Sequence, residues 1–393
     1  MNMKPFFIIH RNSLDSLFGA LVGRNFTLVG PTLRDRAVAY SEIATVNDLP
    51  FGWTDEQDGG TYRLKKSDRQ TLFDYAAGPH SWKKFLFPPA LQLWEAERQI
   101  GPHEASPEYP PSHEGRGEQP RYAMIGVRSC DLHAIAVQDK VFAEGSHRDP
   151  TYEARRKNLF IVAVNCSHGG GTCFCRSMNT GPRATSGFDL ALTEILEADR
   201  HVFLAESGSD RGAQVLREVT QEEAQESDIR AAERITADAS VPMGRLMDTT
   251  DIRGLLYNNY DHPRWDHAAA RCLACGNCTI VCPTCFCNTV EDFTDLAGTR
   301  AERRRRWDVC FAVDFSYIHG GSVRSTIRSR YRQWLTHKVA TWIDQFGTSG
   351  CVGCGRCITW CPVGIDITEE VREIRANRPD DRKTLSEVGH AHT

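Results

Sequence analysis

Two copies of one cysteine pattern, C-x2-C-x2-C-x3-C-P, constrain this chain of 393 residues more than any other feature of its sequence. The first copy consists of Cys272, Cys275, Cys278 and Cys282, and the second of Cys351, Cys354, Cys357 and Cys361. In such a run three thiolates wrap around one [4Fe–4S] cluster, and the fourth, beside the proline, ligates the other cluster. The spacing therefore predicts two clusters with crossed ligands.

The crossed arrangement divides the eight cysteines into two predicted ligand sets. The first cluster site consists of Cys272, Cys275, Cys278 and Cys361. The second cluster site consists of Cys282, Cys351, Cys354 and Cys357. Zinc is the main alternative, because CxxC pairs also bind zinc, but two pairs do not explain runs of four with a trailing proline. Cysteines that act as small buried hydrophobic residues would not repeat a four-point spacing.

The remaining composition bears on the compartment and on the partners. The apolar stretch at residues 6–9 is too short for a signal peptide, and no segment approaches the roughly 20 apolar residues that cross a bilayer. We therefore expect a cytoplasmic protein, in which fifteen cysteines hold metal rather than disulfides. A net charge of −4 and a pI near 6.4 give no general affinity for nucleic acid or anionic membranes.

The distribution of the cysteines predicts two domains. No cysteine occurs between residues 176 and 271, an interval that contains the polar stretch 221–240, which is predicted to be an exposed helix or a linker. We place the boundary near residue 245. Residues 1–245 are expected to form an α/β domain, and residues 246–393 a helical ferredoxin-like domain that binds two [4Fe–4S] clusters.

Apolar patterning predicts the elements of these domains. Short apolar runs predict buried strands of a mostly parallel sheet at residues 6–10, 26–30, 123–127, 159–164 and 202–206. Helix-like spacing predicts flanking helices at residues 32–43 and 131–142, the latter with Asp131 as N-cap. A long amphipathic helix is predicted at residues 321–346, and a surface loop at residues 101–120.

Four further cysteines are candidates for a third cluster. Cys130 and Cys166 each follow a predicted strand, and the carboxyl ends of adjacent parallel strands lie at one edge of a sheet. With Cys173 and Cys175 they would supply four thiolates, here called the third cysteine group, and Asp131 is a substitute candidate. The alternative is that the four are buried thiols that shape turns around the domain interface.

Three cysteines belong to none of these sets. Cys285 and Cys287 lie in a TCFC motif at residues 284–287 that also occurs at residues 172–175. We expect them to pack beside the second cluster and hydrogen-bond to its sulfurs, which would tune its potential. Cys310 is expected in the core. The chain contains no HExxH, GxSxG or P-loop motif, so we expect no catalysis of its own.

The chain resembles the β subunits of cytoplasmic sulfhydrogenases, which are NAD(P)-linked [NiFe] hydrogenases that also reduce sulfur. It is equally similar to the corresponding electron-transfer subunit of anaerobic sulfite reductase, a relative in the same family. The second domain carries RCLACGNCTIVCPTCFCNTVEDF, WDVCFAVDFSYIHGG, RYRQWLTHK and CVGCGRCITWCPVGIDI, and the first HSWKKFLFPP, GVRSCDLHAIAVQDKVF and NCSHGGGTCFCRSMNTGP. GVRSCDL and TCFC are more specific to this family than the double cysteine run, which occurs in many iron–sulfur proteins.

The resemblance implies the iron–sulfur electron-transfer subunit of a soluble NAD(P)-linked [NiFe] hydrogenase. Its partners would be a flavin subunit that binds NAD(P)H and the small and large nickel–iron subunits. An alternative is the electron-transfer subunit of an anaerobic sulfite reductase, with the other sulfite reductase subunits as partners. An alternative of another class is an iron–sulfur redox sensor or scaffold. These functions differ in partners that this sequence does not contain.

Overall fold

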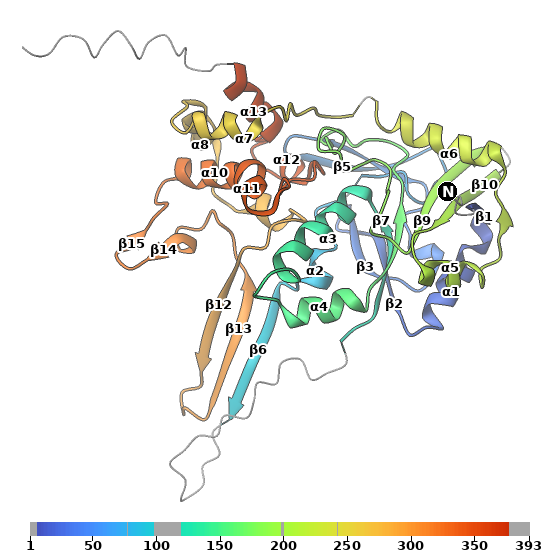
Figure 1. The fold of residues 1–393 in the computed structure, drawn as a ribbon, viewed down its shortest axis with the longest axis horizontal. Helices are drawn as coiled ribbons and strands as arrows, with labels where there is room; N and C mark the ends of the chain where they lie inside the picture. Colours follow the sequence, from blue (N-terminus) through green and yellow to red (C-terminus); the bar gives the residue numbers. More distant parts are fainter. Residues whose placement is uncertain (1–5, 77, 98–118, 198–199, 242, 377–393) are drawn as a thin grey trace, which may run out of the picture.

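A mixed sheet forms the centre of the N-terminal region in the computed structural model, which describes residues 6–76, 78–97, 119–197, 200–241 and 243–376 (Figure 1). Within these residues the sheet has eight strands in the order β11–β1–β10–β9–β8–β7–β2–β3. Their bounds are Phe6–His10 (β1), Thr27–Arg34 (β2), Ala37–Glu42 (β3), Tyr122–Val127 (β7), Phe160–Val164 (β8), Leu190–Glu197 (β9), Arg200–Ser207 (β10) and Glu222–Glu223 (β11). The apolar runs predicted as strands coincide with β1, β2, β7, β8 and β10.

The prediction of a mostly parallel sheet is wrong, because the sheet is mixed. Parallel pairing joins β2 to β7, β7 to β8 and β8 to β9, whereas β1, β3, β10 and β11 pair antiparallel with their neighbours. The predicted helix at residues 32–43 is also wrong, since β2 and β3 form a hairpin there. Asp35 and Arg36 have φ of 50° and 60°, and two consecutive positive φ values make the tight hairpin turn of type I′.

Helices cover both faces of this sheet (Figure 1). They are α1 (Leu14–Val22), α2 (Lys83–Leu86), α3 (Ser129–Phe142), α4 (Pro150–Lys157), α5 (Asp210–Leu216) and α6 (Glu226–Asp238). α1 and α5 share one core with β2 and β10, and α3 and α4 share another with β7 and β8. α3 confirms the predicted helix at 131–142, but Arg128 rather than Asp131 occupies its N-cap position. α6 lies within the polar stretch 221–240 and packs on β9 and β10.

The C-terminal region is mainly helical and surrounds an aromatic core. Its helices are α7 (Ile252–Asn258), α8 (Arg264–Arg271), α9 (Asn277–Ile280), α10 (Ile327–Thr336), α11 (Trp342–Phe346), α12 (Arg356–Thr359) and α13 (Ile367–Ala376). Trp265, Tyr331 and Trp334 are buried in this core together with Phe174 from the N-terminal region. A π-helical turn at His337–Thr341 joins α10 to α11, so residues 327–346 are helical, while residues 321–322 of the predicted helix form a short strand instead.

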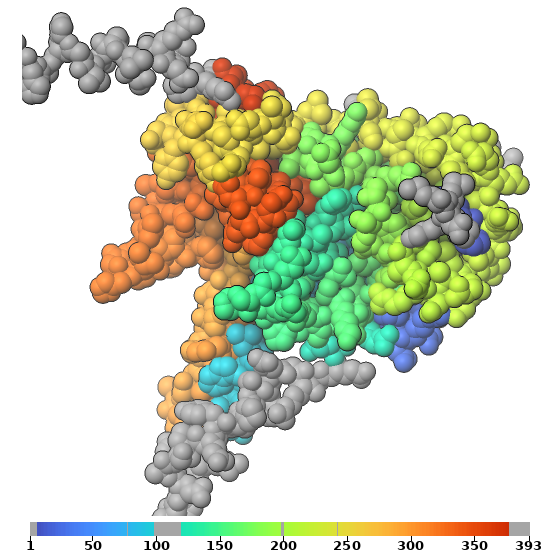
Figure 2. All heavy atoms as spheres, viewed as in Figure 1, coloured from blue at the N-terminus to red at the C-terminus, as the bar shows by residue number. Residues whose placement is uncertain are grey.

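A small sheet in the order β12–β13–β6 projects from the packed body of the molecule (Figures 1 and 2). β6 (Ala90–Glu97) comes from the N-terminal region, and β12 (Asn288–Thr294) and β13 (Arg300–Trp307) come from the C-terminal region. The arginine run 303–306 lies on β13 and is paired with acidic residues, as in Arg303 with Asp292 at 2.6 Å.

Short hairpins complete the described chain, formed by β4 (Trp53–Asp58) with β5 (Thr61–Lys66), and by β14 (Tyr317–Ile318) with β15 (Gly321–Ser322). The predicted surface loop at residues 101–120 lies outside the described residues up to residue 118. Within the described residues, no helix has the length and apolar character required to span a membrane.

Candidate metal centres

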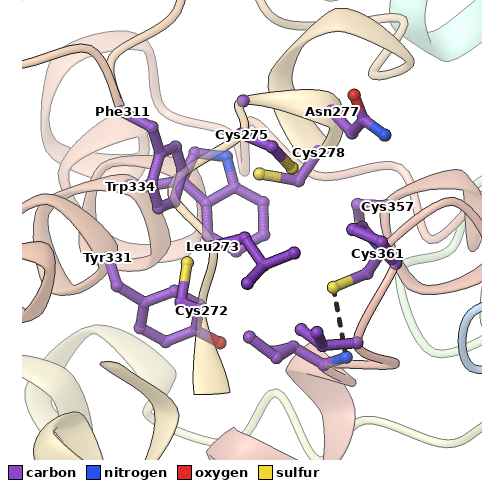
Figure 3. Close-up of a pocket in the computed structure, with 14 residues that line it drawn as sticks. Cys272, Leu273, Cys275, Asn277, Cys278, Phe311, Tyr331, Trp334, Cys357 and Cys361 are labelled. Carbon is purple, nitrogen blue, oxygen red and sulfur yellow. Dashed lines mark hydrogen bonds between the residues drawn. The ribbon is translucent and has the colours of Figure 1, made fainter. Parts of the chain in front are cut away.

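Cysteines from both C-terminal runs line one cavity (Figure 3). Its lining includes the predicted first cluster site, Cys272, Cys275, Cys278 and Cys361, together with Cys357 and the aromatic residues Phe311, Tyr331 and Trp334. About 420 Å³ of space lies between these protein atoms. Cys275 is exposed to solvent, so this cavity lies next to the molecular surface. The structure thus brings together three cysteines of the first run and the last cysteine of the second.

Left-handed turns curve the first cysteine loop around the cavity. After helix α8 the backbone passes through Ala274 at φ 52° and Gly276 at φ 76°. Backbone N–H groups donate to two of the sulfurs: Ala274 N to Cys272 Sγ at 3.4 Å, and Ile365 N to Cys361 Sγ at 3.3 Å. Because such donors stabilise negative charge on sulfur, they favour the thiolate form that binds metal.

The cysteines of the second cluster site lie close together in the interior. Cys282 and Cys351 are 7% and 8% exposed. Burial raises the pKa of the Cys357 thiol well above its ordinary value, and the sulfurs of Cys351, Cys354 and Cys282 raise it further. Free thiolates would repel one another here, whereas thiolates bound to a metal centre are neutralised by its positive charge.

The sulfurs of these sites are arranged differently from the ligands of a single metal ion. In the part of the chain that the structure describes, no three histidine, cysteine or acidic side chains converge on a point that one ion could occupy. A zinc site requires such a point, with sulfurs about 2.3 Å from the metal. In a [4Fe–4S] cluster each thiolate binds a different iron, and sulfurs spread around a cavity fit that arrangement.

A buried lysine that sequence reasoning missed faces the second cluster site. Lys338 is 5% exposed, and its Nζ lies 3.1 Å from Cys282 Sγ, 3.4 Å from Thr284 Oγ1 and 3.5 Å from Cys285 Sγ. Burial acts to lower the pKa of Lys338, but the sulfurs of Cys282 and Cys285 act in the opposite direction and raise it well above its ordinary value. The second cluster site therefore has a cation beside one of its predicted ligands.

Both TCFC motifs contact the second cysteine run. In the first motif, the hydroxyls of Thr172 and Thr359 are hydrogen-bonded at 2.7 Å. In the second motif, Thr284 Oγ1 donates to the carbonyl oxygen of Gly350, also at 2.7 Å. The repeated tetrapeptide, noted in the sequence without a structural role, therefore provides a threonine contact to this loop from each of the two regions.

Glycines in the second run allow the first TCFC motif to approach closely. Phe174 N donates to the carbonyl oxygen of Gly353 at 2.8 Å. Gly353 and Gly355 have φ of 65° and 75°, and a Cβ at Gly355 would lie 2.4 Å from the carbonyl oxygen of Thr172. A side chain at either position would therefore be strained and would separate the two segments.

The third cysteine group comes together beside the second cluster site. Cys173 Sγ lies 3.8 Å from the carbonyl oxygen of Cys354. Burial raises the pKa of the Cys175 thiol, and the sulfurs of Cys173, Cys166 and Cys354 add to this. Cys130 is affected in the same way by burial, by Asp131 and by the sulfurs of Cys175 and Cys354. Asp131 itself, the substitute candidate, binds the guanidinium of Arg356 with both carboxylate oxygens.

The three unassigned cysteines lie near the second cluster site and the C-terminal core. Cys285 contacts the Lys338 ammonium, as described above. Cys287 and Cys310 are hydrogen-bonded to each other, and this bond lowers the pKa of Cys287 to about 7. Cys310 is partly buried and packs against the C-terminal core.

Comparison with known proteins agrees with this geometry. Residues 271–365, which contain both cysteine runs, match the family described as "4Fe-4S dicluster domain". Over 259 residues the chain is 35% identical to the protein named Sulfhydrogenase 2 subunit beta of Pyrococcus furiosus. That match covers 64% of this chain and 75% of the relative.

Proposed function

Because the chain belongs to the family of sulfhydrogenase β subunits, we propose that it is the iron–sulfur electron-transfer subunit of an NAD(P)-linked [NiFe] hydrogenase. It would connect a flavin subunit that binds NAD(P)H with the nickel–iron subunits, in the cytoplasm. No catalytic site of its own is part of this proposal. Bound [4Fe–4S] clusters would supply one-electron transfer, and the protein would hold them at fixed positions.

One observation carries the proposal: Cys361 lines the same cavity as Cys272, Cys275 and Cys278. This is the crossed ligand set that the double run predicts for a pair of neighbouring clusters. Cys357 lines the cavity as well, which places the second cluster site directly beside the first. Adjacent sites of this kind suit a protein that moves single electrons between partners.

The third cysteine group extends this series into the N-terminal region. Its contact with the carbonyl oxygen of Cys354 places it next to the second cluster site. We propose that Cys130, Cys166, Cys173 and Cys175 hold a third cluster. The exposed Cys275 lies at one end of the series, so the first cluster site is the one we propose to face a partner subunit.

Metal and cofactor analysis of the native complex, purified anaerobically through this chain, tests the proposal. We expect about one nickel per complex, together with flavin and iron, and no siroheme. Siroheme without nickel would assign the chain to a sulfite reductase instead. A chain that purifies with iron but without either partner would favour the sensor or scaffold alternative.

A further inference from the structure

Lys338 is fixed against the second cluster site by its backbone as well as by its side chain. It lies in the π-helical turn, where the helical hydrogen-bond pattern is interrupted. Its carbonyl oxygen accepts a hydrogen bond from Gly350 N at 2.8 Å, directly before Cys351. The turn and the second cysteine run are therefore held in register.

The surroundings of the Lys338 ammonium are unusual for a buried cation. In the described part of the chain its hydrogen-bond partners are the sulfurs of Cys282 and Cys285 and the hydroxyl of Thr284. No carboxylate is among these partners. Because a buried charge is costly unless a counter-charge offsets it, the negative charge must be supplied by the sulfur side of the contact.

The first cluster site has a different environment. Hydrogen bonds to its sulfurs in the described residues come from backbone N–H groups, at Cys272 and Cys361. Its cavity walls are the aromatic side chains of Phe311, Tyr331 and Trp334. The two sites thus share a ligand pattern but differ in that a fixed cation touches one of them.

We propose that Lys338 is a positioning residue that raises the reduction potential of the second cluster relative to the first. Reduction adds a negative charge to a cluster, and a cation 3.1 Å from Cys282 Sγ stabilises the reduced form. The second cluster site would then be the station where an electron resides between the two partners. This inference rests on the proposed function, in which Cys282 ligates a cluster.

EPR-monitored redox titration of the anaerobically purified full-length chain tests this role. The test variant is Lys338→Met, which removes the charge but keeps the length of the side chain. At the potential where the wild-type second cluster is half reduced, we expect at least a tenfold lower ratio of reduced to oxidised cluster, or about 59 mV for one electron. The first cluster should keep its potential.

Two further variants separate charge from structure. Lys338→Arg keeps the cation and should restore a potential near that of the wild type. Lys84→Met removes a half-buried lysine that instead donates to the Tyr40 carbonyl oxygen at 2.7 Å, and it should change neither cluster. An unchanged potential in Lys338→Met, with both clusters present, would overturn the inference.

The outcome also distinguishes this inference from the proposed function. If the wild-type chain lacks the two cluster signals, the proposed function fails before Lys338 is tested. If Lys338→Met loses the second cluster, Lys338→Gln provides the same comparison, since it keeps a donor for Cys282. Loss of the cluster in both variants would show that Lys338 is needed for assembly, and the tuning role would be rejected.

Discussion

Arg356 and Asp131 form a two-point ion pair in the interior, with Nη1 2.8 Å from Oδ1 and Nη2 2.9 Å from Oδ2. Both side chains are 1% exposed. Arg356 lies between Cys354 and Cys357 of the second run, and Asp131 follows Cys130 in helix α3. The pair therefore connects the second cluster site to the third cysteine group.

Asp131→Asn should lower the stability of the protein strongly. The substitution leaves the Arg356 guanidinium buried without its counter-ion, and loss of one partner of a buried pair costs about 3–5 kcal/mol. Thermal unfolding of the full-length chain measures this as a lower midpoint. The double variant Asp131→Asn/Arg356→Met should recover much of the loss, because neither charge then remains. A double variant no more stable than the single one would contradict the interpretation.

Crossed ligands predict which cysteine variants share a phenotype. Cys278→Ala and Cys361→Ala should remove the same EPR signal, although the residues lie in different runs. Cys282→Ala and Cys351→Ala should remove the other signal. If instead Cys361→Ala behaves like Cys351→Ala, each run binds its own cluster and the assignment is wrong.

Iron content tests the third cysteine group. Cys166→Ala and Cys173→Ala should each reduce the iron bound per chain by about four atoms, the content of one [4Fe–4S] cluster. The control is Cys310→Ala, which removes a cysteine outside the three sets. Equal iron in all of these proteins would mean that the group consists of buried thiols.

Acid should destabilise the protein through His337. Burial lowers the pKa of His337 from 6.5 to about 4, and the neighbouring Lys338 ammonium contributes to the shift. Because the unfolded chain binds this proton more readily, the contribution to stability is complete above pH 6.5 and is lost progressively as the pH falls towards 4.

The His337 prediction is measured by comparing unfolding midpoints at pH 7 and pH 5. In His337→Gln the midpoint should fall less between these two values than in the wild type, since glutamine does not titrate. Equal decreases in the two proteins would show that other groups determine the acid response.

The sequence predicted elements whose signals are local. Helix α3 and the strands β1, β2, β7, β8 and β10 follow from short apolar patterns, because burial selects the same residues that the pattern contains. Residues 32–43 misled because their alternation also fits a helix, and the turn at Asp35 and Arg36 lacks the glycine that normally indicates a type I′ hairpin.

The sequence could not predict contacts that depend on tertiary packing. Lys338 occurs in an amphipathic segment where a lysine usually faces water, and nothing nearby in the chain indicates the π-helical turn that directs it inward. Arg356 is equally inconspicuous between two cysteines, although its partner Asp131 was noticed for another reason. The division of the chain near residue 245 stays a prediction.

The pairing of β6 with β13 has a consequence for synthesis. In the described chain β6 lies at the edge of its sheet and pairs with β13, whose residues follow it by some two hundred positions. On a ribosome adding about 5–20 residues per second, β6 would wait roughly 10–40 s for its neighbour. During that interval its unpaired edge is exposed to other nascent chains, and Glu95 and Glu97 place negative charges on it that discourage such association.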